Sequence, residues 1–203
     1  MSVESVMARI AEINGLLTPP RAQTATVPAD MTFGNVLNQA TATAGPGAAA
    51  PVGWMQGGGV GQKMLAIASA EVGQAEQPPG SNDSARIAQY RSATAGSGVG
   101  PWCAYFVSWA AQQAGAPIGE QGQGFGAVAA VWDWAQRTGR TVPAGSTPQP
   151  GDLIVWDGRH IGIVESVGAD GSIHTIDGDS SDQVSRRTYG ADGGGATGYV
   201  RLG

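Results

Sequence analysis

The chain of 203 residues has one cysteine, few basic residues and no long apolar run. A single cysteine excludes an internal disulfide framework and a four-thiolate zinc site. Only 11 lysines and arginines are spread over the chain, whose net charge is −5, so the basic stripe of a nucleic-acid-binding protein is missing. No apolar run approaches the roughly 20 residues that cross a bilayer. We therefore expect no nucleic-acid partner and no membrane span.

The first 17 residues lack the pattern of a secretory signal peptide, because they have no basic head and Glu4 and Glu12 interrupt their apolar residues. Their apolar residues instead recur at helical spacing, which predicts a short amphipathic helix. Residues 18–61 are rich in Ala, Gly, Pro and Thr. Such a composition buries too little surface to offset the entropy of ordering, so we expect a flexible, disordered linker. Residues 62–203 are then the folded domain.

Within that domain, helical periodicity comes first and strand alternation follows. Four helices are expected: over 64–72, around Ile87 and Tyr90, over 103–114 and over 127–138. Strands are expected near 152–156, 160–167, 172–177, 183–189 and 198–202. Helices followed by an antiparallel sheet indicate an α+β fold, with the helices packed on a small sheet.

Cys103 stands where the sequence predicts the first turn of a helix. Pro101 is tolerated at such a start, apolar residues follow Cys103 at i+3, i+4 and i+7, and Gly115 ends the stripe. The free N–H groups and the dipole at a helix N-terminus stabilise a thiolate. Cys103 is therefore the candidate nucleophile. The alternative is ordinary core packing, since free cysteines are among the most buried residues.

A nucleophilic cysteine needs a base, and the only histidines are His160 and His174. The length of the hairpin loop between their two strands decides which face of the sheet each histidine lies on. If residues 168–171 form a four-residue loop, Val167 pairs with Ser172, and the two histidines point to opposite faces of the sheet. A two-residue turn at Asp170 and Gly171 shifts the register by two and keeps these faces, whereas a three-residue loop would reverse them.

With the four-residue loop, His160 lies opposite Asp179 and diagonal to Asp177 on one face. His160 is therefore expected to be the base, oriented by a carboxylate. His174 has Ile161 and Ile163 as neighbours and is expected to be an outer strand residue.

Three motifs occur in order along the domain: WCAYFVSW at 102–109, QPGDLIVW at 149–156 and HIGIV at 160–164. Together with the Gly-Ser-Asn segment at 80–82, they resemble the CHAP domain, the cysteine- and histidine-dependent amidohydrolase/peptidase group of the NlpC/P60 superfamily. The resemblance extends over about residues 62–203. It implies a papain-like fold and cleavage of an amide bond in peptidoglycan, as an N-acetylmuramoyl-L-alanine amidase or a cross-link endopeptidase, without a metal or organic cofactor.

The chain departs from the family pattern at the third site. The family commonly has a glutamate followed two positions later by an asparagine, whereas this chain has Asp177 and Asp179. A shorter carboxylate still accepts the imidazole N–H bond, so either aspartate is a candidate partner for His160. The oxyanion is expected near the backbone N–H of Cys103.

The same residues suggest three alternative functions, each less well supported. A zinc hydrolase using Cys103, His160 and His174 is disfavoured, because the two histidines point to opposite faces. The three aspartates in 177–182 resemble a calcium loop but lack the closing glutamate. A wall-binding module without catalysis would use the six tryptophans for sugar stacking, but the presence of both Cys103 and His160 favours an enzyme.

The start of the chain also resembles the head of flagellum-associated wall hydrolases. Export by the flagellar apparatus would bring such a protein to the extracellular or cell-wall space of a bacterium without a classical signal peptide, and a phage endolysin released by lysis is the alternative. We expect the protein to be a monomer.

Overall fold

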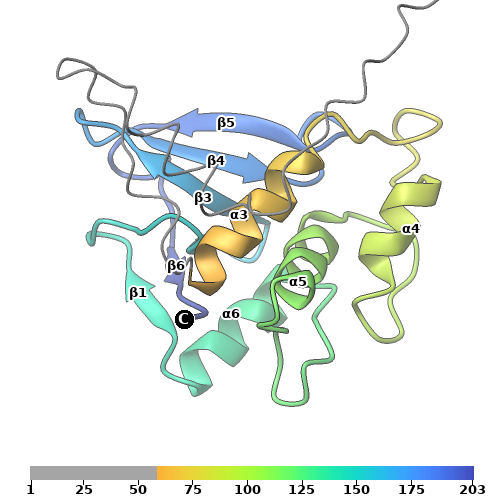
Figure 1. Cartoon of the computed structure of the whole chain (residues 1–203), viewed down its shortest axis with the longest axis horizontal. Coiled ribbons are helices and arrows are strands. Elements are labelled where there is room, and N and C mark those ends of the chain that lie inside the picture. The colour runs from red at the N-terminus through yellow and green to blue at the C-terminus, as the bar shows by residue number, and fades with distance from the viewer. Residues whose placement is uncertain (1–58) are drawn as a thin grey trace, which may run out of the picture. The chain divides into compact units, whose positions relative to one another are not determined.

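The computed structural model describes residues 59–203, which form an α+β unit (Figure 1). The helices come first: α3 (Val60–Ala70), α4 (Ala85–Arg91), α5 (Cys103–Gln113) and α6 (Val128–Arg137). The expected order, helices before an antiparallel sheet, is confirmed. Helix α3 begins two residues before the predicted start of the domain. The predicted helix over 1–17, and the predicted linker up to residue 58, lie outside the described residues.

The sheet has six antiparallel strands in the order β1-β6-β2-β3-β4-β5. Their bounds are Thr141–Pro143, Leu153–Trp156, His160–Val167, Ile173–Asp177, Ser185–Tyr189 and Gly198–Val200 for β1 to β6. The sequence did not predict strand β1. It has three residues and a proline, too short a run to show alternation, and its pairing with β6 defines it.

The β3–β4 hairpin differs from its predicted register at the loop. The predicted pairing of Val167 with Ser172 is wrong, because Val167 pairs with Ile173 and the loop has one residue more than expected. A β-bulge at Glu165 adds one residue to β3. Beyond the bulge, from Ile163 toward the start of β3, the two shifts cancel and the expected register returns.

Apolar side chains cover both faces of the central strands. Helices α3 and α5 contact β3 on one face, where Ile161 and Ile163 join a core with Trp102 and Phe106. A second cluster lies apart from it, formed by Ile154, Trp156, Val164, Ile173 and Tyr199 with Tyr189 packed against them. Within the described residues, no helix is long and apolar enough to cross a membrane.

Candidate active site

Cys103 is the first residue of α5 and is buried. The preceding residue, Trp102, is the N-cap and its side chain makes no capping bond. The turn after β4 supports this end of the helix, since Asp179 Oδ2 accepts a hydrogen bond of 3.0 Å from the backbone N–H of Trp102. The sulfur thus lies at the positive end of the helix dipole, where negative charge is favoured.

His160 is the first residue of β3, and Asp177 is the last residue of β4. Nε2 of His160 lies 3.0 Å from Oδ2 of Asp177. The aspartate side chain is fully buried, whereas 27% of the histidine side chain is exposed. Because Nε2 contacts the carboxylate, Nδ1 is the ring nitrogen left for the thiol and for a substrate.

The pKa of His160 reflects these neighbours. Burial by itself lowers the pKa of the imidazole, but the hydrogen bond with Asp177, the nearby thiol of Cys103 and the charges of both groups raise it to about 10. The imidazole is therefore protonated at neutral pH. Such an imidazolium stabilises a thiolate and has a proton to give.

The two candidate carboxylates have different partners. Asp177 contacts His160, whereas Asp179 accepts the hydrogen bond from the backbone N–H of Trp102, just before Cys103. Strand β4 ends at Asp177 and Asp179 has a positive φ of 56°, so the ladder that would place Asp179 opposite His160 does not continue. Burial, with Glu76 and Asp182 nearby, raises the pKa of Asp179.

Two further residues, which the sequence did not identify, shape the site. The hydroxyl of Tyr189 donates to Asp177 Oδ2 at 3.1 Å. A Cβ built on Gly162 would lie 2.2 Å from Asp177 Oδ1, so only glycine leaves room for the carboxylate. An isolated glycine inside an apolar strand is itself a signal of close approach. No local signal identifies Tyr189, because its contact depends on β4–β5 pairing.

The Gly-Ser-Asn segment at 80–82 is linked to the nucleophile through a buried carboxylate. Glu76 Oε1 accepts from the indole N–H of Trp102 at 2.9 Å, and Oε2 accepts from the backbone N–H of Asn82 at 2.8 Å. Glu76 therefore fixes the residue immediately before Cys103.

The proline-glycine-aspartate motif has a structural role. Asp152 accepts two hydrogen bonds from Arg201, at 2.9 and 2.7 Å, and one from the backbone N–H of Gln149 at 2.7 Å. These bonds tie the start of β2 to the end of β6. A pocket of about 280 Å³ beside this ion pair is lined by neither Cys103 nor His160.

His174 lies away from these groups, with Nδ1 3.0 Å from Thr188 Oγ1 and Nε2 3.4 Å from Ser172 Oγ. The structure therefore does not bring the zinc set of Cys103, His160 and His174 together. Within residues 59–203, no group of three His, Cys, Asp or Glu side chains is arranged to hold a metal ion.

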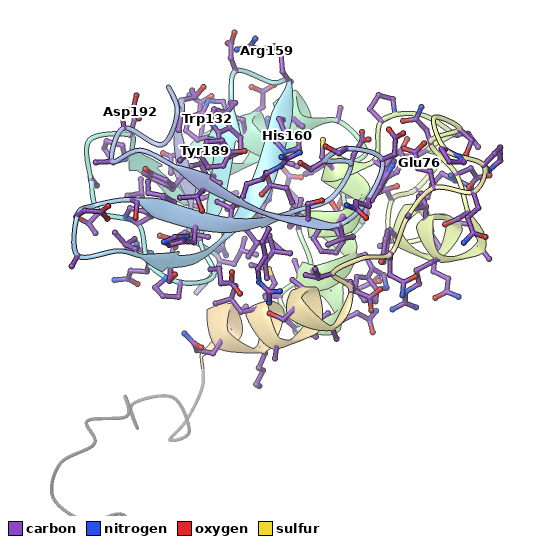
Figure 2. All side chains as sticks on the ribbon, turned by 90° about the horizontal axis from the view of Figure 1, so that it is seen from above. Glu76, Trp132, Arg159, His160, Tyr189 and Asp192 are labelled. Atoms are coloured by element: carbon purple, nitrogen blue, oxygen red, sulfur yellow. The ribbon has the colours of Figure 1, made fainter. Side chains whose placement is uncertain are left out.

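The tryptophans offer little surface for sugar stacking in the part of the chain that is described. Trp102, Trp134 and Trp156 are buried, and Trp109 and Trp132 are partly buried against the core. Figure 2 shows Trp132, Arg159, His160 and Tyr189 along the same side of the molecule in that view.

A family model described as CHAP domain matches residues 94–179. The matched range contains Cys103, His160 and Asp177 and ends at Asp179. No curated protein and no solved structure matches the chain.

Proposed function

The chain carries a CHAP domain, as its three motifs predicted, and from this premise we propose that it is a peptidoglycan hydrolase that cleaves an amide bond through a thiol mechanism. The observation that supports this best is the environment of His160. Its imidazole lies 3.0 Å from a buried carboxylate, and the only thiol of the chain, Cys103, is near enough to raise its pKa. This is the arrangement that nucleophile, base and orienting group require.

In the proposed reaction, the Cys103 sulfur attacks the carbonyl carbon of the scissile amide. The tetrahedral intermediate collapses as the C–N bond breaks, and the His160 imidazolium gives its proton to the leaving amine. A thioester remains on Cys103. Neutral His160 then takes a proton from water, the hydroxide attacks the thioester, and the carboxylic acid leaves as the sulfur is released. Asp177 holds the ring and stabilises its charged form.

The first turn of α5 supplies the electrostatic stabilisation. The N–H groups of the first helical turn have no acceptor within the helix, and Cys103 is the first helical residue. An oxyanion formed at the carbonyl under attack would receive the Cys103 N–H.

The central experiment is Cys103→Ala assayed on purified sacculi. Lysis should disappear, while binding to sacculi and the melting temperature stay close to those of the wild type. An alanine variant that keeps a substantial fraction of the wild-type rate would exclude the thiol mechanism. A wild-type protein that binds sacculi without lysing them would make it a wall-binding module.

Mass spectrometry of the released fragments assigns the bond. An N-acetylmuramoyl-L-alanine amidase frees whole stem peptides from the glycan, whereas a cross-link endopeptidase leaves stem peptides attached to muramic acid. The chemistry of Cys103 and His160 serves both bonds.

The proposal extends to location: the enzyme acts in the cell-wall space, reached through the flagellar export apparatus. It is supported by the resemblance of the first residues to flagellum-associated wall hydrolases. Deleting residues 1–17 in a flagellated host should stop export and leave the activity of the purified protein unchanged. Normal export of the deletion variant would favour release by lysis, as for a phage endolysin.

A further inference from the structure

Tyr189, the last residue of β5, contacts the carboxylate that orients the base. Its hydroxyl donates to Asp177 Oδ2 at 3.1 Å, and the same oxygen lies 3.0 Å from His160 Nε2. The other oxygen of this fully buried carboxylate, Oδ1, has no hydrogen-bond partner among the described residues. The two bonds on Oδ2 are thus the only polar support that residues 59–203 give to the side chain of Asp177.

We propose that Tyr189 is a positioning residue for the His160–Asp177 pair. It holds the carboxylate in line with the imidazole. This inference rests on the proposed function, because it concerns the same thiol–imidazole chemistry.

The ring of Tyr189 is held by packing on more than one side. The rings of Tyr189 and Trp156 are 4.8 Å apart between centroids, and the rings of Trp156 and His160 are 5.5 Å apart. Trp156 is itself fixed by a hydrogen bond of 2.7 Å from its Nε1 to the carbonyl of Gly193. A Cβ on Gly194, which has a φ of +64°, would lie 2.8 Å from Tyr189 Cδ1. The loop after β5 therefore leaves the tyrosine ring little freedom.

The hydroxyl has an electrostatic consequence as well as a geometric one. The hydrogen bond with Asp177 is one of the causes that raise the pKa of His160. Without the hydroxyl, Asp177 Oδ2 keeps only His160 as a partner, and the carboxylate is free to turn away from the ring. The pKa of His160 should then fall from about 10 toward its ordinary value.

Several titratable groups bear on this prediction. His160 of β3 faces Asp177 directly, and Cys103 of α5 is near enough to His160 to affect its pKa. Burial and Asp177 raise the pKa of Tyr189, and Arg187 on β5 opposes them. Asp179 follows β4, and the charge of His160 acts on its carboxyl group. A substitution at Tyr189 leaves His160, Cys103, Arg187 and Asp179 in place.

The chain offers a matched control in Tyr199. It is fully buried in the second cluster, to which Tyr189 is packed, and its hydroxyl has no hydrogen-bond partner among the described residues. Tyr189→Phe and Tyr199→Phe thus remove the same atom from the same region. Only the first removes a bond to the catalytic carboxylate.

The experiment compares kcat, KM and the melting temperature of the wild type and both variants on soluble wall fragments over a range of pH. Rates are normalised to the fraction of Cys103 that reacts with an alkylating reagent, which corrects for any misfolded protein. For Tyr189→Phe, we expect kcat to fall about tenfold with KM little changed, and the pKa of His160, followed by NMR, to fall from about 10 by about one pH unit. Tyr199→Phe should keep the wild-type rate and the wild-type titration of His160.

A His160 titration in Tyr189→Phe that coincides with that in Tyr199→Phe would overturn the inference, as would equal losses of rate in both variants. Failure of the proposed function gives a different result, since the wild type itself would then not cleave the fragments.

Discussion

Gly162→Ala tests whether the close approach of Asp177 to β3 is needed for activity. Gly162 is buried in β3, and the added methyl group would lie 2.2 Å from Asp177 Oδ1 and 2.9 Å from Cγ. Ordinary contact needs about 3.5 Å, so the carboxylate or the strand must move by roughly 1 Å. Asp177 is the end of a paired strand and its side chain is buried on all sides. The movement therefore falls on the His160–Asp177 contact.

A displacement of about 1 Å away from β3 would stretch that contact from 3.0 Å to about 4 Å, which is beyond hydrogen-bond distance. Misplacement of this size at a reacting group costs about 100-fold in rate. Overpacking of the strand should also lower the free energy of unfolding by about 1–3 kcal/mol. The loss of activity thus exceeds what the loss of stability explains.

Two measurements separate these effects. The rate on soluble wall fragments is normalised to reactive Cys103, and the titration of His160 is followed by NMR, where the weakened contact should bring the pKa down from about 10. Gly145→Ala is the control, because its added methyl group meets nothing within 4 Å. A Gly162→Ala protein with more than half the wild-type rate and an unchanged His160 titration would refute the reasoning.

Three other outcomes are expected. His160→Ala should lose about 10³-fold or more in rate, whereas His174→Ala should lose little, and similar losses would mean that the register at Ile163 is misassigned. The raised pKa of His160 stabilises the fold fully below about pH 6.5, the ordinary histidine value, and this contribution is lost as the pH rises through about 10. The free energy of unfolding, measured in urea, should therefore fall between these two pH values more in the wild type than in His160→Gln. If it fell equally in both proteins, His160 would not be charged in the folded state. Activity should survive EDTA and be lost on alkylation of Cys103. A loss in EDTA that added metal reverses would instead indicate a metal site at the aspartates in 177–182.

Local signals in the sequence were enough to place the helices and most of the strands. Cys103 begins α5 as the apolar stripe and Pro101 predicted, and the alternation around His160 identified β3. Each of these signals lies within a few residues of the element that it defines. Gly162 differs, because its role depends on Asp177, which lies on the neighbouring strand.

Features that depend on partners far along the chain could not be read in this way. The extra loop residue and the bulge at Glu165 are both invisible in the pattern, and the correct face of His160 was predicted because the two shifts cancel. Asp179 was a candidate partner of His160 because regular alternation was extended beyond the last residue of β4. The contact of Tyr189 with Asp177 requires the pairing of β4 with β5.

The short turn at the end of β4 connects the two parts of the candidate site. Asp177 contacts His160, and two residues later Asp179 accepts a hydrogen bond from the backbone N–H just before Cys103. Between them, a Cβ on Gly178 would lie 2.6 Å from Phe106 Cβ, so the backbone of the turn lies directly against α5. One tripeptide thus sets the position of both His160 and the start of α5. A change in the length of this turn would therefore displace the imidazole and the sulfur relative to each other.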